Sequence, residues 1–160
     1  FKFGEVLITV YKLQRLTGAR VLCVRQAGLR MTPVTTSVVI SARDAAAGKL
    51  FDDTRRWPEW GQSVARVECG DRCIGPGTTG RVQTVFGLWL SFQVTEFRAG
   101  HCWRWRVAGI AATGHRVEAL GPDRCRVVFE VPVVAAPYLV VCRWAAQRIK
   151  NILERERQPA

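Results

Sequence analysis

The chain has 160 residues, a formal net charge of +11 at pH 7, 48% hydrophobic residues and 23% charged residues. These values suit one globular domain large enough to bury a core, and no apolar run approaches the ~18 residues that a membrane-spanning helix needs. The charge indicates an anionic partner or only an arginine-rich surface. No basic motif interleaved with aromatic residues is present, so we predict no nucleic-acid partner.

Residues 1–30 differ from the remainder of the chain. They hold six basic residues against one acidic residue, and a strand-like run over 6–11 precedes an arginine every five residues from Arg15 to Arg30. This spacing winds around a helix rather than marking one face. We therefore interpret 1–30 as an N-terminal appendage and predict that the domain spans 31–157.

Two short helices are expected after a first strand. The β-branched run over 34–41 predicts the strand, and the alanine-rich stretch over 42–53 predicts the first helix. Proline restricts the residue before it to extended geometry, so this helix is expected to end before Trp57. A second short helix is expected to begin at Pro58.

Beyond Gly61 the hydrophobic period changes to two, which predicts strands in hairpin succession. The strands are expected over 63–69, 78–86, 88–97, 103–107, 114–120 and 125–131. The alternation sets Arg104, Arg106 and Arg126 opposite the apolar side chains, so one face of the sheet is expected to be solvated.

The segment from about 136 to 157 is the only long one with a sustained helical period. Leu139, Cys142, Ile149 and Leu153 recur at steps of three and four residues, with polar residues between them. Strands in succession that are closed by a long helix predict an α+β fold in which the helix covers one face of an antiparallel sheet.

Six cysteines raise the question of disulfides or a metal site. No secretory signal is recognisable, so free thiols in a reducing compartment, the cytoplasm, are expected. Cys69, Cys73 and the distant His101-Cys102 pair lack the paired, tighter spacing that zinc sites use. We expect no metal and no cofactor.

Four motifs follow one another along residues 35–156. They are Val38-Val39-Ile40-Ser41-Ala42 opening into a helix with Leu50-Phe51-Asp52, then Trp57-Pro58-Glu59-Trp60, Gly77-Thr78-Thr79-Gly80, and Trp103-Arg104-Trp105-Arg106 with Gly114-His115-Arg116-Val117-Glu118. This ordered set resembles the START-like (SRPBCC) helix-grip superfamily, in particular its polyketide cyclase/dehydrase and lipid-transport branch. The resemblance implies a curved antiparallel β-sheet wrapped around a long C-terminal α-helix, with two short helices after the first strand and an apolar cavity between sheet and helix.

Strand parity and the implied cavity together predict the ligand-binding residues. They are Trp60, Phe86, Leu90, Phe92, Trp103, Trp105, His115, Val117, Phe129, Tyr138, Cys142, Ala145 and Ile149. His115 and Tyr138 could also transfer protons and are the candidate catalytic residues, although each aromatic side chain also fits plain core packing. The apolar, proline-bracketed stretch 131–138 departs from the family pattern and is expected to reshape or plug the mouth of the cavity.

Three functions stay open at this point. The first is binding of a hydrophobic small molecule, such as a lipid, a quinone or a polyketide-like compound. The second is a polyketide aromatase/cyclase-type enzyme, in which confinement of the substrate supplies most of the catalysis. The third is a module that docks a basic surface on an anionic membrane or another macromolecule. The sequence shows no established catalytic constellation and predicts no oligomeric state.

Overall fold

The computed structural model describes residues 32–157, so the proposed appendage over 1–30 lies outside the described residues. The elements in chain order are β1 (Val34–Ile40), α2 (Asp44–Asp52), the 3-10 turn η1 (Thr54–Arg56), α3 (Trp57–Trp60), β2 (Val64–Cys69), β3 (Thr79–Thr84), β4 (Trp89–Arg98), β5 (Cys102–Val107), β6 (Ile110–Gly121), β7 (Arg124–Val131), the 3-10 segment η2 (Val133–Tyr138) and α4 (Leu139–Arg157). No helix in this part of the chain has both the length and the apolarity to cross a bilayer.

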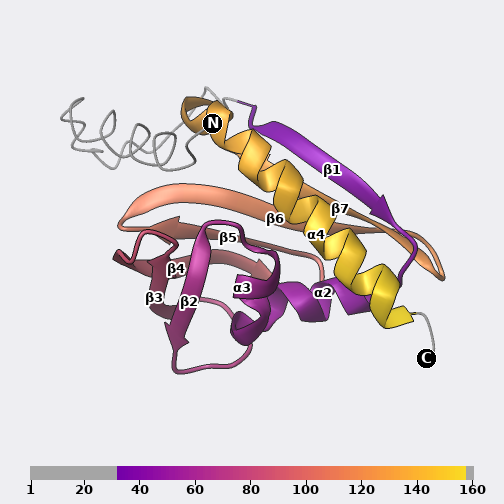
Figure 1. Cartoon of the computed structure of the whole chain (residues 1–160), viewed down its shortest axis with the longest axis horizontal. Helices are drawn as coiled ribbons and strands as arrows, with labels where there is room; N and C mark the ends of the chain where they lie inside the picture. Colours follow the sequence, from indigo (N-terminus) through magenta and orange to yellow (C-terminus); the bar gives the residue numbers. More distant parts are fainter. Residues whose placement is uncertain (1–31, 158–160) are drawn as a thin grey trace.

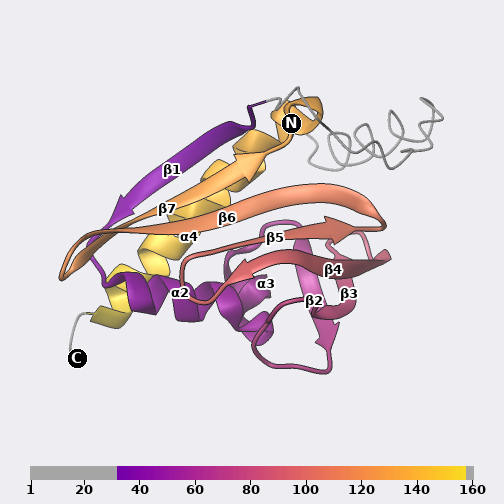
Figure 2. The same cartoon turned by 180° about the vertical axis from the view of Figure 1, so that it is seen from behind.

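The strands of the described residues form one antiparallel sheet of seven, in the order β1-β7-β6-β5-β4-β3-β2. Successive strands from β2 to β7 are hairpin neighbours, while β1 pairs with β7, from Val34 opposite Val131 to Ile40 opposite Cys125. The sheet is curved, and α4 crosses its concave face with α2 and α3 beside it, as Figures 1 and 2 show from opposite sides. This is the helix-grip α+β fold that the sequence predicts.

The apolar stripe of α4 explains why the helix lies on the sheet. Cys142, Ala145, Ala146, Ile149 and Leu153 are all buried, at the predicted steps of three and four residues. Three of these side chains are small, so the helix axis can approach the strands closely. Pro137 lies in η2 rather than in the α-helix, and α4 begins two residues after it.

Trp57 departs from the extended geometry predicted for a residue before proline. Its φ of −57° and ψ of −39° are helical, and it begins α3. The indole is 1% exposed, its Nε1 donates to the Phe51 carbonyl oxygen at 2.8 Å, and its ring stacks on Trp103 with the centroids 5.2 Å apart. Burial of so large a side chain outweighs a local preference of the backbone.

Phe86 is also placed differently from the prediction. It is 48% exposed and lines neither of the two spaces described below. The strand predicted to reach it ends at Thr84, and Gly87, with a φ of +82°, completes the turn between β3 and β4. The parity rule therefore does not apply to Phe86, because parity holds only while the chain remains paired in the sheet.

The outer face of the sheet carries a ladder of charges. Glu130 binds both Arg104 and Arg116, and Glu118 binds both Arg116 and Arg126. The arginine side chains of this ladder are 42–48% exposed, so the pairs gain modest Coulomb energy in water. The alternation of apolar and charged residues thus puts the arginines on the solvated face, as the sequence predicts.

Candidate ligand-binding pocket

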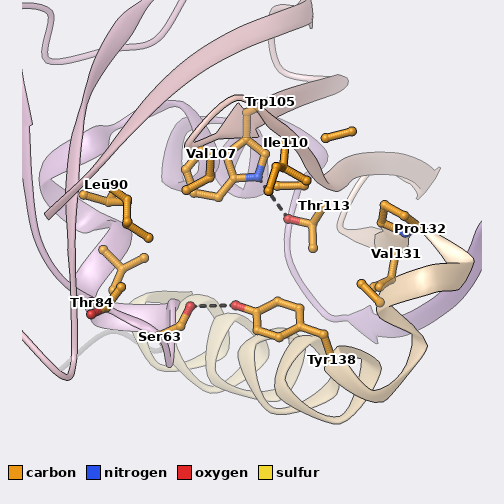
Figure 3. Close-up of a pocket in the computed structure, with 15 residues that line it drawn as sticks. Ser63, Thr84, Leu90, Trp105, Val107, Ile110, Thr113, Val131, Pro132 and Tyr138 are labelled. Atoms are coloured by element: carbon orange, nitrogen blue, oxygen red, sulfur yellow. Dashed lines mark hydrogen bonds between the residues drawn. The ribbon is translucent and has the colours of Figure 1, made fainter. Parts of the chain in front are cut away.

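A pocket of about 130 Å³ opens at one end of the sheet, where β3, β5 and β7 end and β4 and β6 begin. Figure 3 shows its lining residues around a central space, with strands on one side and the start of α4 on the other. Most of its walls are aliphatic, and they include Val82, Leu90, Val107, Ile110, Val131 and Pro132. The pocket is therefore suited to an apolar body that enters beside the N-terminal end of α4.

One side of this pocket is formed by two polar side chains in contact with each other. The Ser63 hydroxyl and the Tyr138 hydroxyl lie 2.6 Å apart, within hydrogen-bond distance. Ser63 directly precedes β2 and Tyr138 directly precedes α4, so this bond links the edge of the sheet to the terminal helix (Figure 3). A hydroxyl can donate and accept, so either side chain could turn toward a ligand.

A second set of polar contacts leads from the pocket wall into the core of the domain. Trp105 Nε1 donates to Thr113 Oγ1 at 3.2 Å, and Thr113 Oγ1 lies 3.2 Å from His115 Nε2. Because an indole nitrogen only donates, the Thr113 oxygen accepts there, and the imidazole tautomer sets which atom donates in the Thr113–His115 contact.

His115 occupies the interior rather than the pocket wall. It is 3% exposed and stacks on Trp103 with ring centroids 3.9 Å apart, and the rings of Phe51, Trp60 and Phe129 surround it. Burial lowers the pKa of His115 to about 3, and the backbone of Trp103 offsets only part of that shift. The ring is neutral at physiological pH, which suits hydrogen bonding better than proton transfer.

A smaller cavity of about 40 Å³ adjoins the pocket on its inner side. It shares Ser63, Trp105, Thr113 and Tyr138 with the outer pocket and extends to His115. Its size leaves room for roughly two waters, or for one polar group of a ligand whose body lies outside. The Ser63–Tyr138 pair and Thr113 thus line both spaces.

The structure distributes the predicted binding residues over four locations. Leu90, Trp105 and Tyr138 line the outer pocket, and Phe86 lies on the exposed hairpin turn. The inner cavity is lined by Trp60, Trp103, Trp105, His115, Phe129, Tyr138, Cys142 and Ala145. Phe92, Val117 and Ile149 belong to the hydrophobic core and line neither space. The binding roles themselves stay predictions.

Several lining residues of the outer pocket were not predicted, and one group of them comes from the start of β6. That strand begins at Ile110 rather than at 114, because Ala108 (φ +50°) and Gly109 (φ +78°) form a tight turn after β5. A two-residue turn ending in glycine between two apolar runs is a hairpin signal that the sequence does contain. It adds 110–113 to the wall, including the polar Thr113.

The stretch 131–138 forms another wall of the mouth. Its Pro132, Ala135 and Tyr138 all line the pocket, and Ala135 interrupts the helical geometry of η2 with a φ of −110° and a ψ of 19°. Among residues 32–157, no cluster of three or more His, Cys, Asp or Glu side chains could hold a metal ion. Hydroxyl, indole and imidazole groups are among the side-chain groups that line the two spaces.

A curved antiparallel sheet that grips a long helix, with an apolar pocket beside the start of that helix, defines a START-like helix-grip protein. The chain belongs to the polyketide cyclase/dehydrase and lipid transport family, whose family model matches residues 31–158. No curated protein is significantly similar to the chain in sequence.

Solved structures share the fold at low sequence identity. The protein XoxI from Bacillus cereus is 10% identical, with a TM-score of 0.63 over 81% of this chain and 100% of that chain. The Zhui aromatase/cyclase from a Streptomyces species is 14% identical, with a TM-score of 0.60 over 78% of this chain and 94% of that chain. A norcoclaurine synthase from Thalictrum flavum is 11% identical, with a TM-score of 0.55 over 83% of this chain and 100% of that chain. At these identities the similarity shows the fold alone.

Proposed function

We propose that this protein binds a hydrophobic small molecule in the pocket at the start of α4. The observation that carries the proposal is the lining: mainly aliphatic walls whose few polar side chains are Thr84, the Ser63–Tyr138 pair and the Trp105–Thr113 pair. Few, placed polar groups within apolar walls are typical of small-molecule sites. Membership of a family described by cyclase and lipid-transport functions supports the same conclusion.

The polar groups support a narrower class of ligand. A ligand with an apolar body and one carbonyl or hydroxyl oxygen could accept the Tyr138 O–H in place of Ser63, an exchange of one hydrogen bond for another that costs little. Quinones, polyketide-like aromatic compounds and lipids with a single polar group all meet this description. A ligand with a fixed charge does not, because the described walls of the pocket contain no charged side chain.

Calorimetric titration of the purified chain with a naphthoquinone, an anthraquinone and a fatty alcohol tests the proposal. We expect at least one member of this panel to bind in the micromolar range. In the variant Ala112→Phe, a phenyl ring occupies the wall, and we expect binding at least tenfold weaker. Ala119→Phe is the matched control, because Ala119 lies on the same strand but is exposed and away from the pocket. Absence of binding across the whole panel, with native mass spectrometry showing no co-purified ligand, contradicts the proposal.

A second candidate function is cyclisation of a reactive chain by an aromatase/cyclase-type enzyme. The observation that favours it is the polar chain from the pocket wall to His115, and one solved structure with this fold is described as an aromatase/cyclase. With its lowered pKa, His115 would orient Thr113 rather than carry protons, so confinement and Tyr138 would supply the catalysis. Incubation with a linear poly-β-keto thioester should then give a cyclised product faster than buffer does, and Tyr138→Phe should slow it. Equal rates with and without protein would remove this candidate.

A further inference from the structure

Exposed apolar side chains border the mouth of the pocket on two elements. Val85, Phe86 and Leu88, in the β3–β4 turn, are 51%, 48% and 61% exposed. Val133 and Val134, in η2, are 40% and 75% exposed. We call these five residues the mouth rim. Large apolar side chains gathered at one opening of a domain are uncommon and usually mark a contact surface.

The two parts of the rim lie on opposite sides of one opening. Thr84 and Leu90 flank the β3–β4 turn in sequence and line one side of the pocket, whereas Pro132 and Ala135 flank the valines of η2 and line another. Figure 3 shows Thr84 and Leu90 across the pocket from Pro132. An apolar surface in contact with the rim would therefore also cover the pocket entrance.

The charges around the rim have one sign. The chain segments at this end of the sheet are 62–66, 82–91, 105–112 and 130–143, and Glu130 is their only acidic residue. Glu130 is held by Arg104 and Arg116 on the outer face. The three arginines of these segments, Arg66, Arg106 and Arg143, are exposed and form no ion pair within residues 32–157.

We propose that the mouth rim docks on an anionic lipid bilayer. Its apolar side chains enter the interface between headgroups and acyl chains, and Arg66, Arg106 and Arg143 contact lipid phosphates and carboxylates. Apolar insertion surrounded by unpaired cations fits an anionic bilayer. Among the described residues at this end, no carboxylate is free to be repelled by such a surface. Docking does not require a bound ligand. It places the pocket entrance against the lipid bilayer, in which apolar compounds dissolve.

The test is co-sedimentation of the full chain with vesicles of phosphatidylcholine alone or of phosphatidylcholine mixed equally with phosphatidylserine, at low salt. We expect binding to the mixed vesicles that weakens as salt is raised. The double variant Phe86→Ser, Leu88→Ser should bind at least tenfold more weakly. Arg106→Gln should bind about fivefold more weakly, the usual effect of one basic residue near an anionic surface.

Matched controls lie at the opposite end of the sheet, in and beside the β6–β7 turn. Leu120 is 42% exposed and Arg124 is exposed, so Leu120→Ser and Arg124→Gln remove the same types of group away from the rim. We expect both controls to bind as the wild type does. Equal losses in rim and control variants, or no binding of the wild type at low salt, overturn the proposal. So does a concentration-dependent dimer that the Phe86→Ser, Leu88→Ser variant abolishes, because the rim would then be occupied by a second copy of the chain.

Discussion

The buried imidazole of His115 predicts a loss of stability in mild acid. Its pKa is lowered from 6.5 to about 3 in the folded protein, so between these values the unfolded chain binds a proton that the folded chain does not. Stability is therefore complete above pH 6.5 and falls as the pH decreases toward the folded pKa. Below pH 6.5 the free energy of unfolding falls by about 1.4 kcal/mol per pH unit. It is therefore lower by roughly 2 kcal/mol at about pH 5 than at neutral pH.

Urea unfolding at about pH 7.5 and about pH 5 measures this loss, and the useful quantity is the difference between the two free energies of unfolding. His115→Phe keeps an aromatic ring in the cluster with Trp103 and Phe129 and should lose most of the pH dependence, whatever its absolute stability. His101→Phe is the control, because His101 is the other histidine of the chain and is exposed. The reasoning is wrong if His115→Phe retains the wild-type difference between the two pH values.

Two further predictions concern the fold. A Cβ atom on Gly80 would lie 2.7 Å from the Phe92 ring and 2.5 Å from a backbone oxygen of β2, so Gly80→Ala should lower the free energy of unfolding by about 2 kcal/mol or more in urea titrations. Gly70→Ala, where a Cβ meets nothing within 4 Å, should have little effect, and a similar cost at both positions would refute the packing argument. Deletion of residues 1–30 should leave the midpoint of thermal unfolding nearly unchanged, as differential scanning calorimetry can show; a large decrease would mean that these residues belong to the domain.

The hydrophobic period of the sequence predicts the helices and strands of this fold well, because the side chains that repeat with that period are the ones that face the core. The stripe from Cys142 to Leu153 is apolar since it lies on the sheet, and the tryptophans of β5 alternate with arginines since only one face of that strand is buried. The errors occur where a strand ends. Phe86 continues an apolar pattern beyond the last paired residue, and the pattern itself does not reveal where hydrogen bonding between strands stops.

The candidate site was harder to predict than the fold, for two physical reasons. Its outer wall includes the start of β6, and the backbone geometry of the Ala108-Gly109 turn sets that start and so brings Thr113 beside Trp105. One of its sides depends on a contact between Ser63 and Tyr138, which are 75 positions apart in the sequence. Contacts between distant residues follow from the pairing of the whole sheet, which no local pattern encodes.

The pairing of β1 with β7 has a consequence for synthesis of the chain. Val34 has its sheet partner at Val131, about a hundred residues later, and α4 follows only after that. At synthesis rates of about 5–20 residues per second, β7 is made roughly 5–20 s after β1, so β1 has no partner strand during that time. The hairpins from β2 to β6 can form during that interval, because each pairs with its neighbour in sequence. A nascent chain halted before β7 would therefore present a folded meander beside an unpaired β-branched strand, which is a ready substrate for chaperones and for edge-to-edge aggregation.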